Sequence, residues 1–345
     1  MNNQFGIIMA GGIGSRFWPE STTEMPKQFL DLLGIGKSFI QQTFERLNRL
    51  VPENQIFILT NERYRSLIKE QIPQISDEQI IAEPVMRNTA PAILYAAKKI
   101  KKINPKAVML VAPSDHYIAK EEKFFDNVQK AFNEVAQHDK LMTLGIVPNA
   151  PNTGYGYIQY QKKDSNPIKK VLAFTEKPIL EKAQEFISQG NYLWNAGIFV
   201  WSVKSILKAF KQFLPEMYQE MSRNEDVYNT PMEKDFIQKY FPLLENISID
   251  YGILEKANNV YVLPADFIWN DLGAWNAIYE QLKTDKVNVS INSELIADNS
   301  SGNLIKTNHK KVVIKDLKNY AIVDTKDVLM IIPRKDDQKV KEYSK

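Results

Sequence analysis

The sequence predicts an α/β fold: a Rossmann-like, mixed and mainly parallel sheet flanked by helices, followed by a small all-β module of β-helix type. Short apolar runs alternate with amphipathic helical segments through the first half of the chain, which is typical of parallel sheets covered by helices. From about Val287, short apolar runs instead recur at close, regular intervals, as in coiled or meandering strands. We therefore predict a large domain over residues 1–285 and a β module over residues 286–345.

The first half of the chain supplies the clearest elements. An apolar run at residues 5–10 predicts a buried parallel strand. Further strands are predicted at 55–60, 79–82 and 107–112, and helices at 38–50, 62–71, 90–103 and 121–138. Pro91 falls near the start of its helix, where proline is tolerated. Strand and helix alternate, so we expect a parallel sheet with helices on both faces.

The middle of the chain is richer in aromatic and β-branched residues and extends this sheet into a mixed one. Strands are predicted at 141–147, 154–160, 170–175, 193–202 and 260–265. Helices are predicted at 179–189, 203–221, 233–241 and 274–282. The charged residues 335–345 are expected to form a short terminal helix or a frayed tail.

The composition is that of an ordinary globular protein, with 44% hydrophobic and 25% charged residues. A formal net charge of +3 gives no reason to expect a nucleic-acid partner. The absence of cysteine excludes a disulfide framework, a thiolate metal site and a cysteine nucleophile. The N-terminus lacks the pattern of a signal peptide, and the apolar runs are too short for a membrane span. A cytoplasmic enzyme is the expectation.

A glycine-rich turn follows the first predicted strand. Its glycine and polar residues, with a lysine that follows, are Gly11, Gly12, Gly14, Ser15, Arg16 and Lys27. Glycines in series let several backbone N–H groups converge on one anion, and the two cations add fixed positive charge. The spacing fits neither a Walker loop nor the dinucleotide fingerprint. The turn therefore predicts a site for the phosphates of a nucleotide, more suited to a triphosphate than to a pyrophosphate.

Two other polar segments follow predicted strands. Residues 83–89 come after the strand at 79–82, and Asp115 comes after the strand at 107–112. Ligands of open α/β sheets bind at the carboxyl ends of the strands. We therefore expect these segments and the glycine-rich turn to share one edge of the sheet.

The motifs together resemble a known family. GGIGSRFWPES with MPKQFL is similar to the signature of the sugar-1-phosphate nucleotidylyltransferases, and the FWP and PKQFL forms resemble the mannose-1-phosphate guanylyltransferase branch. Similar blocks follow in family order: EPVMRNTAPAI, APSDHYI, GYGYI, FTEKP, WNAGIFVW, IDYGILE and WNDLGAW. The tail segment VVIKDLKNYAIVDTKDVLMI resembles the short β module of this branch. The resemblance covers nearly the whole chain, and it makes residues 1–285 a nucleotidyltransferase catalytic domain.

The resemblance implies transfer of GMP from GTP to α-D-mannose 1-phosphate, giving GDP-mannose and pyrophosphate. The attacking phosphate oxygen is already an anion near neutral pH, so the reaction needs no general base. Catalysis must bring two polyanions together and stabilise the charge on the transferring phosphate. Arg16 and Lys27 are the predicted catalytic residues, and Mg²⁺ is the predicted cofactor.

Asp115 and Asp271 are the predicted metal ligands. Each follows an apolar strand, and Mg²⁺ often takes only one or two protein carboxylates alongside phosphates. For either residue alone, a helix cap or a turn would be the simpler interpretation, and the resemblance favours the metal. His116 is expected to be structural or to lie behind the ligands.

The resemblance also implies the substrate contacts. The predicted nucleotide-binding residues are Ala10, Gly11, Gly12, Gly14, Ser15, Arg16, Glu83, Asn88, Thr89 and Ser114. Guanine offers two donors on one edge, which Glu83, Asn88 or the backbone carbonyls of Ala10 and Gly11 could accept; Arg87 is either near the phosphates or structural. The predicted sugar-phosphate residues are Gly156, Glu176, Lys177 and Asn195.

Other functions remain open. Nucleotidyl transfer to another hexose or heptose 1-phosphate differs by only a few contacts. A glycosyltransferase of related fold is disfavoured, because it would carry a DxD metal motif and lack the glycine-rich turn. A non-catalytic nucleotide-sugar sensor is disfavoured by the joint presence of Arg16, Lys27, Asp115, Lys177 and Asp271. The expected partners are the two substrates, with no nucleic acid and no membrane, and the β module is a candidate surface for a homodimer.

Overall fold

The computed structural model describes residues 3–12, 14–162, 166–284 and 287–343. The chain divides into two compact units. The first unit comprises Met1–Gly11, Phe44–Pro113 and Ile118–Trp269, and the second comprises Gly12–Thr43, Ser114–Tyr117 and Asn270–Lys345. The predicted domain boundary between residues 285 and 286 lies outside the described residues and stays a prediction.

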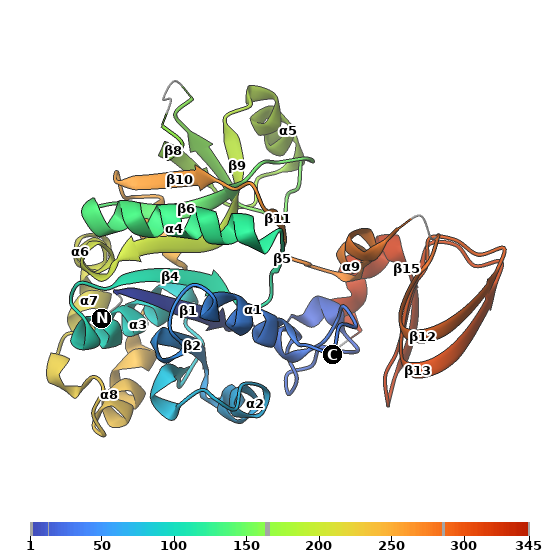
Figure 1. Cartoon of the computed structure of the whole chain (residues 1–345), viewed down its shortest axis with the longest axis horizontal. Helices are drawn as coiled ribbons and strands as arrows, with labels where there is room; N and C mark the ends of the chain where they lie inside the picture. Colours follow the sequence, from blue (N-terminus) through green and yellow to red (C-terminus); the bar gives the residue numbers. More distant parts are fainter. Residues whose placement is uncertain (1–2, 13, 163–165, 285–286, 344–345) are drawn as a thin grey trace. The chain divides into compact units, whose positions relative to one another are not determined.

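A nine-stranded sheet forms the centre of the first unit (Figure 1). Its order is β3-β2-β1-β4-β9-β6-β10-β8-β7. The strands are β1 (Gln4–Ala10), β2 (Ile56–Asn61), β3 (Ile80–Glu83), β4 (Val108–Pro113), β6 (Leu141–Ile146), β7 (Tyr157–Tyr160), β8 (Lys169–Thr175), β9 (Tyr192–Ser202) and β10 (Val260–Pro264). β1 to β4 pair in parallel, whereas β9 is antiparallel to both β4 and β6. The predicted Rossmann-like α/β class with a mixed sheet is confirmed.

The parallel half of the sheet fixes one edge of the first unit. β1 ends at Ala10, β3 at Glu83 and β4 at Pro113. Because these strands run in the same direction, their carboxyl ends lie at the same edge. The segments predicted to hold a ligand therefore begin at this edge, directly after the last residues of β1, β3 and β4.

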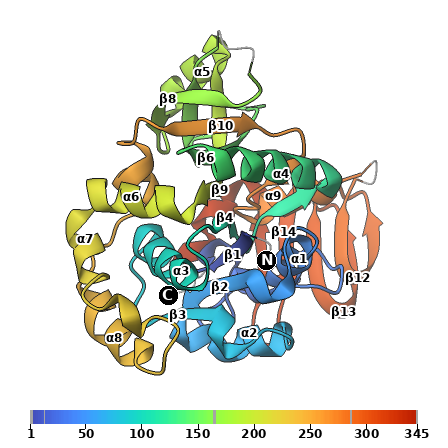
Figure 2. The same ribbon diagram turned by 60° about the vertical axis from the view of Figure 1, so that its left-hand side comes forward.

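Helices cover both faces of this sheet. The helices over residues 39–240 are α1 (Phe39–Asn48), α2 (Arg65–Gln71), α3 (Thr89–Ile103), α4 (Glu121–Gln137), α5 (Leu180–Gln189), α6 (Val203–Phe213), α7 (Pro215–Glu220) and α8 (Glu233–Tyr240). Figure 2 shows α3 beside α6, α7 and α8. One buried cluster joins α3 and α6 to alternate residues of β1 such as Phe5 and Ile7, while α4 contacts β4, β6 and β9 from outside that cluster. Burial on two faces explains why the strands are almost continuously apolar.

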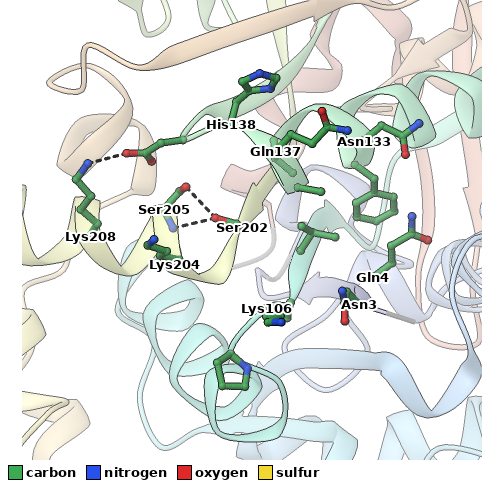
Figure 3. Close-up of a pocket in the computed structure, with 17 residues that line it drawn as sticks. Asn3, Gln4, Lys106, Asn133, Gln137, His138, Ser202, Lys204, Ser205 and Lys208 are labelled. Carbon is green, nitrogen blue, oxygen red and sulfur yellow. Dashed lines mark hydrogen bonds and ion pairs between the residues drawn. The ribbon is translucent and has the colours of Figure 1, made fainter. Parts of the chain in front are cut away.

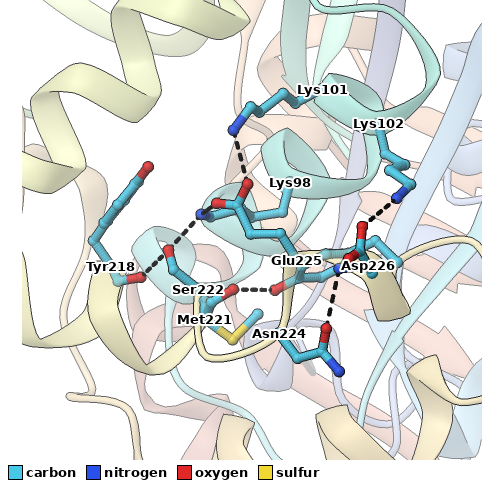
Figure 4. A network of polar contacts seen from close by, with 10 residues as sticks. Lys98, Lys101, Lys102, Tyr218, Met221, Ser222, Asn224, Glu225 and Asp226 are labelled. Atoms are coloured by element: carbon cyan, nitrogen blue, oxygen red, sulfur yellow. Dashed lines mark hydrogen bonds and ion pairs between the residues drawn. The ribbon is translucent and has the colours of Figure 1, made fainter.

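Lysines of α3 also fix this helix by ion pairs (Figure 4). Lys98 Nζ donates to Ser222 Oγ at 2.6 Å and to Glu225 Oε1 at 2.5 Å. Lys101 pairs with the other oxygen of Glu225, and Lys102 pairs with Asp226. The buried Lys98 ammonium is thus matched by a carboxylate, whereas the pair of Lys102 with Asp226 lies at the surface.

The second unit carries the β module. Its strands are β12 (Val289–Asp298), β13 (Leu304–Lys315), β14 (Tyr320–Asp324) and β15 (Leu329–Pro333), which pair in that order. β12, β13 and β14 pair in parallel, and only β15 turns back antiparallel. Successive parallel strands are the pattern of a coil, whereas a meander would be antiparallel throughout. Of the two predicted arrangements, the coil is therefore the one observed.

A buried cluster ties this module to the turn that follows β1. Phe17 packs edge-on against Trp275 of α9 (Trp275–Leu282), with ring centroids 5.2 Å apart. The Trp275 indole N–H donates to the carbonyl of Trp18 at 3.2 Å. The same cluster includes Val289 and Leu304 of the β module. It fixes the glycine-rich turn and α9 as parts of one unit.

Several elements differ from the sequence prediction. The helix predicted at 203–221 is two helices, because Pro215 has no N–H to donate and cannot continue α6. In the β module, the short apolar runs at residues 304–307 and 311–315, which their close spacing predicts as separate strands, belong to one long strand, β13. Two short strands, β5 (Tyr117–Ala119) and β11 (Ile268–Asn270), pair with each other and were not predicted. Residues 334–342 form a 3₁₀ helix.

Over the described ranges, the helices lack the length and apolar character that crossing a membrane requires.

Candidate active site

The glycine-rich turn of the second unit has the backbone that the sequence predicts. Gly12 has φ 102° and Gly14 has φ 67°, a left-handed region that side chains disfavour. A Cβ on Gly14 would lie 2.5 Å from the Cβ of Lys27, so glycine also makes room for that lysine. Gly14 then precedes a single 3₁₀ turn, Ser15–Phe17. The Gln28 side chain donates to the Gly12 carbonyl at 3.2 Å and holds the turn in place.

Lys27 lies at the centre of the second unit's charged groups. Its side chain is 5% exposed, and its Nζ lies 5.5 Å and 5.3 Å from the ring centroids of Phe17 and Phe39. The ammonium donates to Asp115 Oδ2 at 3.0 Å and to the backbone carbonyl of Asp271 at 2.6 Å. One buried cation therefore brings together the two residues predicted to bind metal.

Asp115 is held in its charged form. Burial alone would raise its pKa, but the charges of Lys27 and His116 and the hydrogen bond from Lys27 lower the pKa below its ordinary value. His116, predicted to be structural or to lie behind the ligands, thus acts on Asp115 through its charge.

Arg16 reaches the segment that carries Asp271. Its Nη1 donates to the carbonyl of Gly273 at 3.4 Å. A Cβ on Gly273 would lie 3.1 Å from Asp271 Oδ2 and 3.3 Å from Arg16 Nη1, so both side chains pack over this glycine. The second unit therefore gathers Arg16, Lys27, Asp115 and Asp271, the catalytic and metal-binding residues predicted from sequence.

The donor set of the second unit suits a cation that needs few protein ligands. Within the described ranges, no three histidine, aspartate or glutamate side chains gather into a metal-binding group. Two carboxylates are nevertheless enough for Mg²⁺, which keeps several waters and takes phosphate oxygens as further ligands. Asp115 and Asp271 fit that requirement.

Ser114, predicted to bind nucleotide, is buried beside Asp115. Ser114 is only 2% exposed, and its backbone carbonyl accepts from Thr43 Oγ1 at 3.1 Å. The backbone of Ser114 thus has a structural contact of its own.

In the first unit, the segment after β3 contains an unusual carboxyl group. Glu83 ends the strand and is 8% exposed, and its Oε1 is buried without a hydrogen-bond partner among the described residues. Burial raises the pKa of Glu83 to about 8. A buried acceptor of this kind is costly unless a ligand or another group satisfies it.

The other predicted base contacts have structural hydrogen bonds. Asn88 Oδ1 caps α3 by accepting from the N–H of Thr89 at 2.9 Å, and Thr89 Oγ1 accepts from the N–H of Ile249 at 2.8 Å. The Ala10 carbonyl at the end of β1 accepts from Thr60 Oγ1 at 3.1 Å. Arg87 donates to the carbonyl of Pro242 at 2.5 Å.

The four predicted sugar-phosphate residues lie together in the first unit. The Asn195 N–H donates to the Gly156 carbonyl at 2.8 Å. A Cβ on Gly156 would lie 2.5 Å from Glu176 Oε2, so that carboxylate packs directly on the glycine. Lys177 Nζ donates to Glu176 Oε1 at 2.5 Å while its side chain stays 61% exposed. This arrangement offers carboxylate, amide and ammonium groups within one cluster.

Asp250 belongs to this cluster and was not predicted as a site residue. Asp250 Oδ1 accepts from Asn195 Nδ2 at 2.8 Å. Burial and the charge of Glu176 raise the pKa of Asp250 to about 6. The signal available in the sequence is a single acid inside the otherwise apolar segment IDYGIL.

Backbone strain marks three of these segments. Asn88, Lys177 and Leu272 have φ of 68°, 45° and 44°. Residues other than glycine rarely adopt such angles. Seven further described residues other than glycine also have a positive φ and lie outside the predicted site, so the angle alone does not distinguish it. Asn88 belongs to the predicted nucleotide segment and Lys177 to the predicted sugar-phosphate residues. Leu272 directly follows Asp271, a predicted metal ligand.

A cavity elsewhere in the first unit contains none of the predicted site residues (Figure 3). It measures about 740 Å³ and lies at the amino ends of β1 and β4, where Gln4 and Val108 line it. Lys208, on its rim, is paired with Asp139 at 2.6 Å. Ligands of this fold class bind at the opposite, carboxyl ends of the strands.

Comparison with known proteins decides the family. The family model described as nucleotidyl transferase matches residues 5–287. The chain is 35% identical to mannose-1-phosphate guanylyltransferase of Klebsiella pneumoniae over 97% of this chain and 72% of that protein. It is 36% identical to the enzyme of the same name from Salmonella montevideo, over 94% of this chain and 70% of that protein. The chain belongs to the nucleotidyl transferase family.

A solved structure agrees with this assignment. The crystal structure of mannose-1-phosphate geranyltransferase from Thermus thermophilus superposes with a TM-score of 0.88 at 27% identity. The match covers 99% of this chain and 98% of that one. The resemblance to the mannose-1-phosphate guanylyltransferase branch stated from the motifs is therefore confirmed.

Proposed function

We propose that this protein transfers GMP from GTP to α-D-mannose 1-phosphate, giving GDP-mannose and pyrophosphate. The observation that carries the proposal is that one buried cation, the Lys27 ammonium, donates to both the Asp115 carboxylate and the backbone carbonyl of Asp271. Relatives named mannose-1-phosphate guanylyltransferase match nearly the whole chain, and they support the choice of nucleotide and sugar.

In the proposed reaction, a phosphate oxygen of mannose 1-phosphate attacks the α-phosphorus of GTP in line. The new O–P bond forms as the bond between the α-phosphorus and the bridging oxygen breaks, and pyrophosphate leaves with that electron pair. The attacking oxygen carries a negative charge near neutral pH, so no side chain needs to remove a proton. Lys27 and Arg16 would stabilise the charge that builds on the transferring phosphate.

Members of the nucleotidyl transferase family generally use a divalent metal. We propose Mg²⁺ as the cation and Asp115 with Asp271 as its protein ligands, because the lowered pKa of Asp115 keeps a carboxylate ready at neutral pH. When bound, the cation would neutralise phosphate charge and orient the phosphate oxygens.

The nucleotide is proposed to lie on the turn after β1. The backbone at Gly11, Gly12, Gly14 and Ser15, with the side chain of Arg16, would hold its phosphates. The partnerless oxygen of Glu83 would accept from the guanine N–H groups, and the segment of Asn88 and Thr89, with Ala10 and Ser114, would complete the nucleotide contacts.

The sugar phosphate is proposed to lie on the cluster around Gly156. Lys177, whose ammonium is exposed apart from its contact with Glu176, would pair with the phosphate. Glu176 and Asn195 would hydrogen-bond the hydroxyls, and Gly156 would let the sugar approach the backbone closely.

The test is pyrophosphate release across a matrix of nucleoside triphosphates and sugar 1-phosphates. The expected result is fastest release with GTP and mannose 1-phosphate. Preference for another base or another sugar would contradict the assignment, and no release with any pair would favour a sensor. The cytoplasmic location and the homodimer stay predictions.

A further inference from the structure

The carboxamide of Asn195 is almost fully used by the protein itself. Its Oδ1 accepts from Thr143 Oγ1 at 3.2 Å and from the N–H of Gly197 at 3.1 Å. Its Nδ2 donates to Asp250 Oδ1 at 2.8 Å. An amide side chain has two N–H donors and one oxygen acceptor, so one N–H of Nδ2 remains for a ligand.

Asp250 determines which way this amide faces. A backbone N–H can only donate, and a carboxylate can only accept. Turning the amide over would place its NH₂ against the N–H of Gly197 and its oxygen against the carboxylate of Asp250. The observed orientation is therefore the one that both neighbours favour, and Asp250 supplies its charged, stronger half.

We infer that Asp250 is a positioning residue for the sugar-phosphate subsite: it orients Asn195 so that the amide presents an N–H donor to a hydroxyl oxygen of the sugar. This inference rests on the proposed function, in which Asn195 contacts the sugar. It assigns to Asp250 an effect on sugar binding and none on binding of the nucleotide.

The surroundings of Asp250 make the hydrogen bond that it accepts from Asn195 sensitive to pH. The carboxylates of Glu176 and Glu255 face it, and no described cation is hydrogen-bonded to it. Lys177 is engaged with Glu176, and Lys256 acts on Glu255. Burial and the charge of Glu176 raise the pKa of Asp250 to about 6, so mild acid neutralises the carboxylate. A neutral acceptor holds the Asn195 amide less strongly than a charged one.

The experiment compares Asp250→Ala, Asp250→Asn and the control Glu255→Gln. The control removes an acid from the same segment that has no hydrogen bond to Asn195. For each variant, pyrophosphate release gives the KM for mannose 1-phosphate at saturating GTP and the KM for GTP at saturating sugar phosphate. Thermal unfolding gives the midpoint, which reports a purely structural effect.

Asp250→Ala should raise the KM for mannose 1-phosphate about tenfold, the effect of losing one hydrogen bond to a charged group. The KM for GTP should stay within about twofold of the wild type, because Asp250 does not act on the nucleotide. Asp250→Asn should recover most of the loss, because its carbonyl oxygen still accepts from Asn195 Nδ2. Glu255→Gln should match the wild type.

A pH comparison separates positioning from packing. The KM for mannose 1-phosphate is measured at about pH 5 and about pH 7, on either side of the pKa of Asp250. The ratio of the two values should be larger for the wild type than for Asp250→Asn, which does not titrate. The phosphate of the substrate titrates in the same range, but it affects both proteins equally.

The inference is overturned if Asp250→Ala leaves the sugar KM unchanged. It is also overturned if both KM values and the midpoint shift together, or if Glu255→Gln reproduces the effect. Failure of the proposed function looks different: the wild type itself would turn over another sugar 1-phosphate in preference. The same KM comparison on that sugar would then decide the role of Asp250.

Discussion

The acidic residues of the two compact units differ in how their charge is balanced. In the second unit, Asp115 shares a buried ammonium with the carbonyl of Asp271, and its pKa lies below its ordinary value. In the first unit, Asp250 faces Glu176, has an amide as its hydrogen-bond partner, and has a pKa raised to about 6. Both acids are partly buried, so the neighbouring charge decides the direction of the shift.

This difference matches two kinds of ligand. A carboxylate that stays ionised suits a metal cation and the phosphates it neutralises. A cluster of acids around an amide suits hydroxyl groups, which are neutral and can both donate and accept. This difference is what we expect if the second unit binds the metal and the phosphates that it neutralises and the first unit binds the sugar, as proposed above.

Removing the cation should have the largest effect. Lys27→Met roughly keeps the length of the side chain and removes the charge that we propose stabilises the transferring phosphate. We expect kcat to fall about 10³-fold, as when a preorganised donor to a developing charge is lost. Pyrophosphate release measures it, with Lys326→Met, an exposed lysine of the second unit, as the control. A fall of less than about tenfold would remove Lys27 from the catalytic role.

Removing one metal-binding carboxylate should come next. Asp271→Asn keeps the shape and the backbone carbonyl that accepts from Lys27. We expect kcat to fall about 10²-fold and the Mg²⁺ concentration for half-maximal rate to rise, because an amide binds Mg²⁺ more weakly than a carboxylate. The free energy of unfolding should change by less than about 1 kcal/mol. If activity survives largely intact, Asp271 is a turn residue.

Glu83 tests the rule that an acid without a cation is raised in pKa. Its pKa is raised by burial from 4.5 to about 8. Between these values the folded chain holds a proton that the unfolded chain has lost. The contribution of Glu83 to stability is therefore complete below pH 4.5 and is lost as the pH rises to 8.

Glu83→Gln removes this titration. At about pH 8 the variant should be more stable than the wild type by about 4 kcal/mol, and near pH 4.5 the two should be similar. Denaturant unfolding at the two pH values measures the difference, and Glu70→Gln, an exposed glutamate of α2, is the control. Equal pH dependence in wild type and Glu83→Gln would mean that Glu83 is ionised in the folded chain.

The sequence could predict which segments meet at the sheet edge, because parallel strands deliver their carboxyl ends to one side. It therefore predicts correctly that β1, β3 and β4 end at one edge of the sheet of the first unit. It could not show that Lys27 donates to a backbone carbonyl of Asp271, since such a contact carries no signal in residue type.

Asp250 shows a second limit. It begins a π-helix, Asp250–Leu254, whose irregular hydrogen bonds follow from packing rather than from a local pattern. Its partner Asn195 lies on β9, far away in the chain, so their meeting depends on the finished fold. The break between α6 and α7 was available in the sequence, at Pro215, and was outweighed by the apolar periodicity on either side of it.

The smallest effect should come from the far side of the Asn195 amide. Thr143 is fully buried, and its hydroxyl lies within reach of three acceptors: Asn195 Oδ1 and the carbonyl of Ile198 at 3.2 Å, and its neighbour's carbonyl at 3.4 Å. One hydroxyl proton is shared among them, so Asn195 receives only part of it. Thr143→Val keeps the volume and removes the hydroxyl. The KM for mannose 1-phosphate should rise about threefold, less than for Asp250→Ala, because the Gly197 N–H still holds the oxygen. Thr143→Ser retains the hydroxyl and is the matched control. If Thr143→Val and Thr143→Ser give the same KM, then Asp250 and Gly197 alone orient the amide.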